Sequence, residues 1–375
     1  MNSGRPIQVA FGETIGAVSP PPALLAAKPP AESWLIPAFV DIQVNGFAGV
    51  DYNSPATPHD EIARSIEVLF STGVARFYPT VITGGPDDMA GALANLARAK
   101  ESLAEGAAMD GFHVEGPFIS PDDGPRGAHP RRWARPPDLE EFRRLQDAAR
   151  GQIRLMTLAP EWQGAPAFIE ALAKDGIVVS IGHTNAEAGH IADAVSAGAT
   201  MSTHLGNGAH TILRRHPNYI WDQLAEDRLM ASFIVDGIHL PASFLKVALR
   251  AKSIERAVLV TDASSPAGAK PGRYQLGEQA VDLTEDNRVV LAGQDKLAGS
   301  ALRMDDGVAN LVRLGGLPLA DAVRLATTNA ARAGAVPGRQ QGLIAGDRAD
   351  FVFFRLREGR VAIEATYVGG RRVYG

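Results

Sequence analysis

Four ionisable residues stand at the ends of four separate apolar runs. They are Glu115 in HVEGP, His183 in IGHTN, His204 in THLGN and Asp262 in VTDAS. A single residue of this kind is more often structural, because a strand-end histidine usually only satisfies a hydrogen bond and an aspartate often caps a helix. Four of them at equivalent positions are harder to explain in this way, because an apolar strand that ends in a charge needs a counter-ion or a metal.

One glutamate and two histidines make a three-ligand set with an open coordination position, as in catalytic sites for Zn²⁺ and similar ions. A divalent ion there lowers the pKa of water towards about 7 and polarises a substrate carbonyl. Asp262 is then the carboxylate that accepts the proton and delivers it to a leaving amine. The set predicts hydrolysis of an amide or ester by one divalent ion. Zn²⁺ is the default, and Fe²⁺, Co²⁺, Mn²⁺ or Ni²⁺ suit the same ligands.

Composition excludes several other classes. The chain has no cysteine, which rules out disulfides, thiolate ligands and a cysteine nucleophile. A G-x-S-x-G elbow and the glycine-rich phosphate loops are also missing. The net charge of −5 gives no reason to expect nucleic acid as a partner. The sequence shows no secretory signal and no apolar window long enough for a membrane span, so we expect a cytoplasmic protein.

Eight short apolar runs supply the positions on which this chemistry depends. Amphipathic stretches such as 59–72, 87–104 and 139–149 separate most of them, and this alternation is typical of a parallel sheet with covered faces. The runs are Ile36–Asn45, Ala75–Ile82, Gly111–Glu115, Ile153–Ala159, Ile177–His183, Thr200–His204, Leu229–Val235 and Ala257–Asp262.

The number and spacing of these runs predict an α/β fold, namely a (β/α)₈ TIM-like barrel. An open, doubly wound sheet is the alternative. In a barrel the carboxyl ends of the strands form one face, on which active sites lie. The first run ends in VDIQVNG, so Gln43 and Asn45 point to the same side of their strand. Amides bind zinc poorly beside imidazoles but can hydrogen-bond a water on the metal, which favours one ion over two.

The chain resembles the N-acetylglucosamine-6-phosphate deacetylases of the amidohydrolase superfamily. The matching segments run in the family's order from residue 37 to about residue 354. They are PAFVDIQVNGFAGVDYN, FYPTVIT, GFHVEGPFIS, GHTNA, STHLGNGA, IVDGIHL, LVTDASSPAG, LAGSAL and LATTNAARAGAVPGRQQGLIAGDRADFVFF.

The resemblance implies a role for each matching residue. Glu115, His183 and His204 correspond to the family's metal ligands, and Asp262 corresponds to its catalytic acid and base. Gln43 and Asn45 match the branch of the family with a single metal ion. The remaining matches concern the substrate: His129 near the acetamide and sugar, Asn207 and Gly208 at the sugar phosphate, and Arg215 and His239 at the phosphate group.

In the family that arginine comes from the neighbouring subunit. The resemblance therefore implies a homodimer with Arg215 contributed across the interface, and an amino-sugar phosphate as the small-molecule partner. It also implies a small β-sandwich built from both chain termini. We predict the barrel at 37–335 and the sandwich at 1–36 plus 336–375. The N-terminal part is reduced, because only Arg5–Val9 and Glu32–Ile36 resemble strands.

The segment after His204 departs from the family pattern. Gly208 replaces the usual alanine, and Arg215 to Asn218 replace an acidic turn. His210, Arg214, Arg215 and His216 make this loop basic, which favours an anion site for a phosphate or carboxylate; the alternative is a solvated surface loop. Two alternatives to the sugar phosphate therefore stay open. One is an amidohydrolase for an unphosphorylated N-acetyl sugar or another N-acyl compound, and the other is an inactive ligand-binding scaffold.

Overall fold

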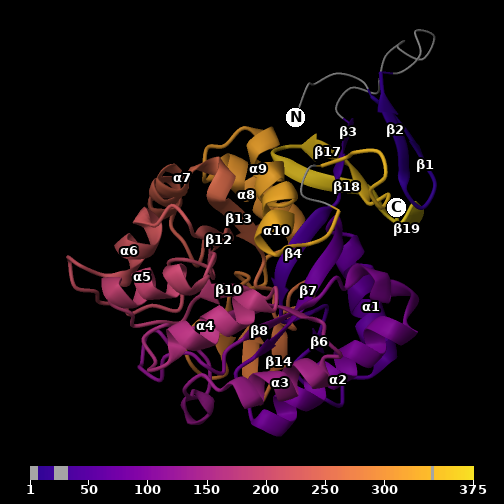
Figure 1. Ribbon diagram of the computed structural model, residues 1–375. Helices are drawn as coiled ribbons and strands as arrows, with labels where there is room; N and C mark the ends of the chain where they lie inside the picture. Colours follow the sequence, from indigo (N-terminus) through magenta and orange to yellow (C-terminus); the bar gives the residue numbers. More distant parts are fainter. Residues whose placement is uncertain (1–6, 21–32, 339–341) are drawn as a thin grey trace.

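Eight parallel strands form the central sheet of the protein (Figure 1). The computed structural model describes residues 7–20, 33–338 and 342–375. Each of the eight predicted apolar runs coincides with one strand of this sheet to within a few residues. In sheet order the strands are β4 (Phe39–Val44), β7 (Val74–Ile82), β8 (Phe112–Glu115), β9 (Ile153–Leu158), β10 (Val178–Ile181), β11 (Met201–Ser202), β12 (Met230–Ile234) and β13 (Ala257–Val260).

The last strand, β13, returns beside the first, β4, so the sheet closes on itself. The backbone amide of Asn45 donates to the carbonyl of Ala263 at 2.7 Å. The hydroxyl of Thr261 donates to the buried carboxylate of Asp41 at 2.5 Å. Burial raises the pKa of Asp41 to about 7, although Thr261 partly offsets this rise. The closed (β/α)₈ barrel is thus confirmed, and the alternative of an open sheet is wrong.

Helices cover the outside of the barrel because each one buries an apolar stripe against it. In α1 the buried residues Ile62, Ile66 and Leu69 recur at helical spacing. The side chain of Asp138 caps α3 by accepting from two backbone amides of the first turn. The α-helices are α1 (His59–Phe70), α2 (Pro86–Ser102), α3 (Leu139–Ala148), α4 (Ala165–Lys174), α5 (Ala188–Ala197), α6 (Tyr219–Ala225), α7 (Ala242–Arg256), α8 (Met304–Arg313), α9 (Leu319–Leu325) and α10 (Thr328–Ala333); two 3₁₀ turns are η1 (Ala104–Ala108) and η2 (Arg131–Trp133).

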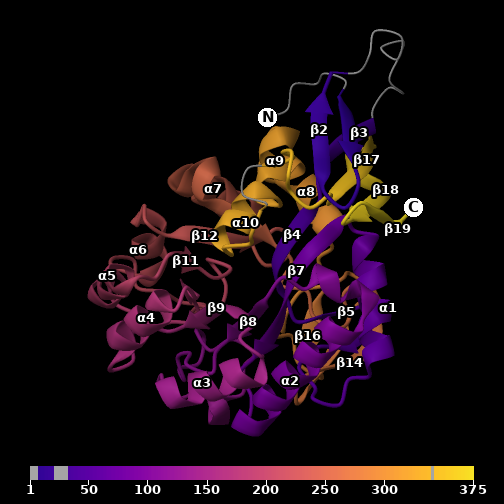
Figure 2. The ribbon, with the colours of Figure 1, turned by 45° about the vertical axis from the view of Figure 1, so that its right-hand side comes forward.

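Both chain ends contribute to a small β-sandwich beside the barrel (Figure 2). One sheet has the strand order β3 (Ser33–Pro37), β17 (Phe351–Arg357), β18 (Arg360–Val368) and β19 (Arg371–Tyr374). The other is the hairpin of β1 (Gln8–Phe11) and β2 (Ile15–Ser19). Phe11 packs edge-on against Phe351 at 4.7 Å between ring centroids, which joins the two sheets.

The predicted strands at 5–9 and 32–36 correspond to β1 and β3, while β2 was not predicted. Residues 5, 6 and 32 lie outside the described residues. The chosen boundaries, 37–335 and 1–36 plus 336–375, stay a prediction. Every helix in the described parts of the chain is too short or too polar to cross a lipid bilayer.

A three-stranded antiparallel sheet follows the last barrel strand and was not predicted. It consists of β14 (Gly272–Leu276), β15 (Gln279–Leu283) and β16 (Val289–Leu291). Its strands are short and only half-buried, so their apolar residues alternate weakly along the sequence. A further small hairpin, β5 (Gly46–Phe47) with β6 (Val50–Asp51), follows β4. The turn between β14 and β15 lies at the mouth of the barrel, where the candidate site is found.

Candidate metal centre and active site

The four predicted chemical residues all lie at the carboxyl ends of barrel strands. Glu115 is the last residue of β8, and the other three follow β10, β11 and β13 by two residues. His183, His204 and Asp262 have φ angles of 51°, 30° and 50°. Non-glycine residues seldom adopt this left-handed conformation, and it is enriched at functional sites. At each of these residues the chain therefore turns away from its strand direction.

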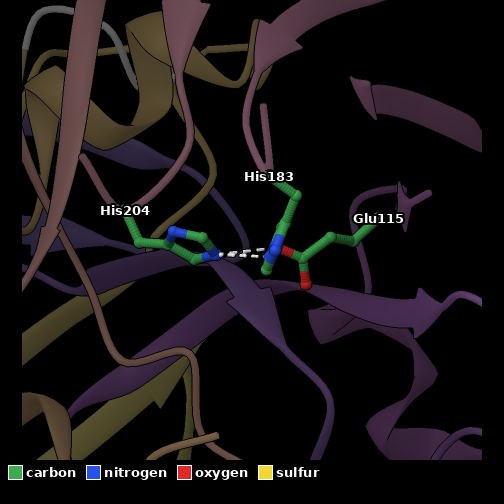
Figure 3. Close-up of side chains that lie close together, drawn as sticks. All are labelled: Glu115, His183 and His204. Atoms are coloured by element: carbon green, nitrogen blue, oxygen red, sulfur yellow. Dashed lines mark hydrogen bonds and ion pairs between the residues drawn. The ribbon is translucent and has the colours of Figure 1, made fainter. Parts of the chain in front are cut away.

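Glu115, His183 and His204 point toward one another (Figure 3). Oε1 of Glu115 lies 3.1 Å from Nε2 of His183 and 2.9 Å from Nε2 of His204. The two imidazole Nε2 atoms are 3.1 Å apart. All three side chains are buried. One carboxylate oxygen and two imidazole nitrogens that converge in this way fit a small divalent cation.

The surroundings of His183 fix which ring nitrogen is available. Nδ1 lies 2.8 Å from the carbonyl of Pro125 and must be the nitrogen that donates, so Nε2 keeps its lone pair for a metal. Gly208, with φ at 55°, passes close to the same ring. A Cβ at this position would lie 2.7 Å from Nδ1 of His183. The glycine that replaces the family's alanine therefore lets the chain approach the ligand closely.

The electrostatics of the trio keep its buried carboxylate ionised. Burial raises the pKa of Glu115, but the imidazoles of His183 and His204 that face the carboxylate outweigh burial and hold this pKa well below its usual value. Burial lowers the pKa of His204, whereas the neighbouring Glu115 carboxylate raises it more. A buried carboxylate thus stays ionised only because cationic or donor groups face it, and a bound cation would serve the same purpose.

Asp262 lies next to the trio and is held by two amides. Its Oδ1 accepts from Nδ2 of Asn45 at 2.7 Å and from Nε2 of Gln43 at 3.0 Å. The same Gln43 nitrogen lies 3.1 Å from Oε1 of Glu115. Both amides therefore point to the predicted side of β4, where they contact carboxylates. Burial and the charge of Glu115 raise the pKa of Asp262 to about 6, which suits a group that takes up a proton near neutral pH.

The structure brings most of the predicted substrate residues into one cavity with this centre. His129, Asn207, Gly208 and His239 line it together with the metal trio and Asp262. The ring of His129 packs against that of His183 at 4.3 Å between centroids. Burial lowers the pKa of His129 to about 3. Arg215 is different: its side chain is exposed and does not line this cavity in the single chain.

Sequence reasoning missed several residues that line the cavity, and it missed Asp236 beside the predicted His239. Nδ1 of His239 is held by the carboxylate of Asp236 at 2.6 Å, and this i, i+3 pair is visible in the sequence as DGIH. Ile82 ends β7, which the apolar run already placed at the barrel mouth. Leu276 and Gln279 flank the β14–β15 turn, which was not predicted. No pattern in the sequence indicates that this turn lies near the metal ligands.

Comparison with known proteins assigns the family. The model of the Amidohydrolase family matches residues 34–373. The chain belongs to the amidohydrolase family. The curated N-acetylglucosamine-6-phosphate deacetylase of Bacillus subtilis is 35% identical over 326 residues, which cover 86% of this chain and 81% of that protein. The human protein of the same name is 34% identical, over 91% of this chain and 83% of its own length.

Solved structures agree with the sequence relatives. An N-acetyl-D-glucosamine-6-phosphate deacetylase mutant from Mycobacterium smegmatis, in complex with N-acetyl-D-glucosamine-6-phosphate, superposes with a TM-score of 0.86. It is 32% identical, and the match covers 97% of this amidohydrolase and 93% of that chain. The resemblance predicted from the sequence motifs is thereby confirmed. The relatives are hydrolases, and the amidohydrolase shares their fold and carries a candidate divalent-metal site.

Proposed function

We propose that this amidohydrolase hydrolyses the acetamide of N-acetylglucosamine 6-phosphate, or of a close N-acetyl amino-sugar phosphate, to the amino-sugar phosphate and acetate. One observation carries the proposal: Glu115, His183 and His204 converge at the barrel mouth with Asp262 beside them. Relatives of 34–35% identity that bear this name support the choice of substrate.

Glu115, His183 and His204 would hold one divalent ion, for which we propose Zn²⁺. Two imidazole nitrogens and a carboxylate fit this ion, and the hydrogen bond from His183 to Pro125 leaves the nitrogen it needs. When bound, the ion supplies an acidified water and polarises the substrate carbonyl. Gln43 and Asn45 bind Asp262 instead of a second ion, which supports a single-metal centre.

Asp262 acts as the general base and then as the general acid. Its Oδ1 is fixed by the amides of Gln43 and Asn45, so the carboxylate is pre-oriented beside the metal trio. As base it takes a proton from the attacking water, and as acid it delivers that proton to the amine nitrogen when the C–N bond breaks. Neutral His129, whose pKa burial lowers to about 3, contacts the acetamide and sugar as a hydrogen-bonding group without charge.

The sugar phosphate lies toward Asn207, Gly208 and His239, and Arg215 reaches it from a second subunit of a homodimer. Arg215 is exposed in its own chain. Ile212, on the same loop, is 87% exposed, and Trp221, in the following helix α6, is 47% exposed. Large exposed apolar side chains of this kind are expected on a surface that another protein covers. The absence of cysteine supports a cytoplasmic location for this homodimer.

Arg215→Ala tests the phosphate contact. We expect KM for the phosphorylated substrate to rise about 10-fold or more, because a charge-assisted contact to phosphate is lost, while kcat changes little. Arg214→Ala, an exposed neighbour on the same loop, is the matched control and should change KM less. Steady-state kinetics with N-acetylglucosamine 6-phosphate and with plain N-acetylglucosamine measures this difference. Equal KM values for the native chain and Arg215→Ala would remove the role given to this arginine.

The substrate itself is tested by acetate release from purified, metal-loaded protein. We expect turnover of N-acetylglucosamine 6-phosphate and much weaker turnover of the same sugar without phosphate. Equal activity on both would favour the alternative of an unphosphorylated N-acetyl sugar or another N-acyl compound. Binding of the sugar phosphate without any acetate release would favour the inactive scaffold.

A further inference from the structure

The cavity around the metal trio has a polar side and an apolar side. Asn207 and Gly208 follow β11, and His239 follows β12. Ile82 lies at the end of β7, which is four strands from β11 in the ring of eight and therefore across the barrel mouth from it. Leu276, from the β14–β15 turn, lines the same cavity.

Ile82 is placed directly beside the reacting centre. In the β7–β8 ladder it is the register partner of the metal ligand Glu115. Side chains at paired positions of parallel strands point to the same side of the sheet, so Ile82 points into the barrel mouth as Glu115 does. The amide of Ile82 donates to Oδ1 of Asn53 at 2.7 Å, which fixes the end of this strand.

A second cavity lies behind these apolar residues. It is lined by residues 53–55, 81–85 and 276–279, among others, and shares Ile82, Leu276 and Gln279 with the metal cavity. These three residues thus line both spaces and lie between them. We call Ile82, Leu276 and Gln279 the partition.

The partition is held by hydrogen bonds from both sides. Leu276 and Gln279 are paired across their turn. Nε2 of Gln279 donates to the carbonyl of Ala128 at 2.6 Å, beside His129. The amide of Gly277 donates to Oδ2 of Asp51 at 2.7 Å. The turn is therefore hydrogen-bonded to two other segments at the barrel mouth, and these bonds fix its position beside the metal cavity.

An N-acetyl amino-sugar phosphate presents one apolar terminus, the methyl group of its acetamide. When the carbonyl lies at the metal trio and the sugar phosphate lies toward Asn207 and His239, this methyl points to the opposite side. We propose that the partition bounds the acyl end of the substrate and thereby limits hydrolysis to short N-acyl groups. This inference rests on the proposed function, and it identifies specificity-determining residues for that reaction.

A series of N-acetyl, N-propionyl and N-butyryl glucosamine 6-phosphates tests the proposal. For the native chain we expect kcat/KM to fall about 10-fold or more with each added methylene, because a close wall rejects extra bulk. Ile82→Ala opens the partition toward the second cavity, so the ratio of butyryl to acetyl kcat/KM should rise at least about 10-fold. Leu276→Ala should shift the ratio in the same direction and serves if Ile82→Ala is unstable.

Ile234→Ala is the matched control, because Ile234 lines the metal cavity at the end of β12, on the polar side. It loses the same bulk but should change the ratio less than about 2-fold. An unchanged ratio in Ile82→Ala and Leu276→Ala, both still active on the acetyl compound, would overturn the proposal. So would a larger rise in Ile234→Ala than in either. Failure of the native chain to release any acid would instead overturn the proposed function, and the acyl limit with it.

Discussion

Asp262→Asn is expected to retain one divalent ion per chain while kcat for acetate release falls about 10²- to 10⁴-fold. An asparagine oxygen can still accept the hydrogen bonds that Oδ1 of Asp262 receives from Gln43 and Asn45. Its geometry is therefore preserved. An amide cannot take up a proton, however. The variant therefore lacks the group that accepts the proton from water and delivers it to the leaving amine.

Metal content and single-substrate kinetics, measured on the same protein sample, check this prediction. Asp60→Asn, an exposed aspartate in the first turn of α1, is the control and should keep native kcat. Normal turnover in Asp262→Asn would show that this carboxylate does not handle the proton. Loss of the metal together with turnover would show instead that Asp262 is a ligand.

His204→Ala is expected to lose both metal and turnover. The imidazole contributes one of only three convergent ligand atoms, 2.9 Å from Oε1 of Glu115. Removal of an outer partner of a ligand already costs about 10- to 100-fold in metal affinity, so removal of a ligand should cost more. The buried Glu115 carboxylate would also lose one of the two groups that hold its pKa down.

Competition with a chromogenic chelator measures the metal affinity of His204→Ala against that of the native chain. His59→Ala is the matched control, because His59 is the first residue of α1, lies outside the candidate site and hydrogen-bonds with Asn95. The control should bind metal as the native chain does. Native affinity in His204→Ala would place the metal elsewhere in the protein.

The barrel and the centre of its site were accessible from the sequence because both depend on local patterns. A buried parallel strand must be continuously apolar, so its last residues are visible where the apolar run breaks into HVEGP or GHTN. The closed barrel then brings those ends together without further information. Gln43 and Asn45 were found for the same reason, since their spacing of two residues puts both amides on one face.

Leu276 and Gln279 of the partition and the strand β2 of the sandwich hairpin were not accessible in this way. Leu276 and Gln279 lie on half-buried strands, and their proximity to the metal depends on long-range contacts such as that of Gln279 with Ala128. β2 has a single buried residue, Ile15, so it lacks an apolar pattern. The role of Arg215 depends on a second chain, and its exposed position in one chain leaves that role a prediction.

Stepwise reloading of the metal-free protein with Zn²⁺ tests the central claim most directly. Acetate release from N-acetylglucosamine 6-phosphate should be absent at first, rise in proportion to the metal added, and stop rising at one ion per chain. Activity that needs two ions per chain, or that persists in the metal-free protein, would contradict a single catalytic ion held by Glu115, His183 and His204.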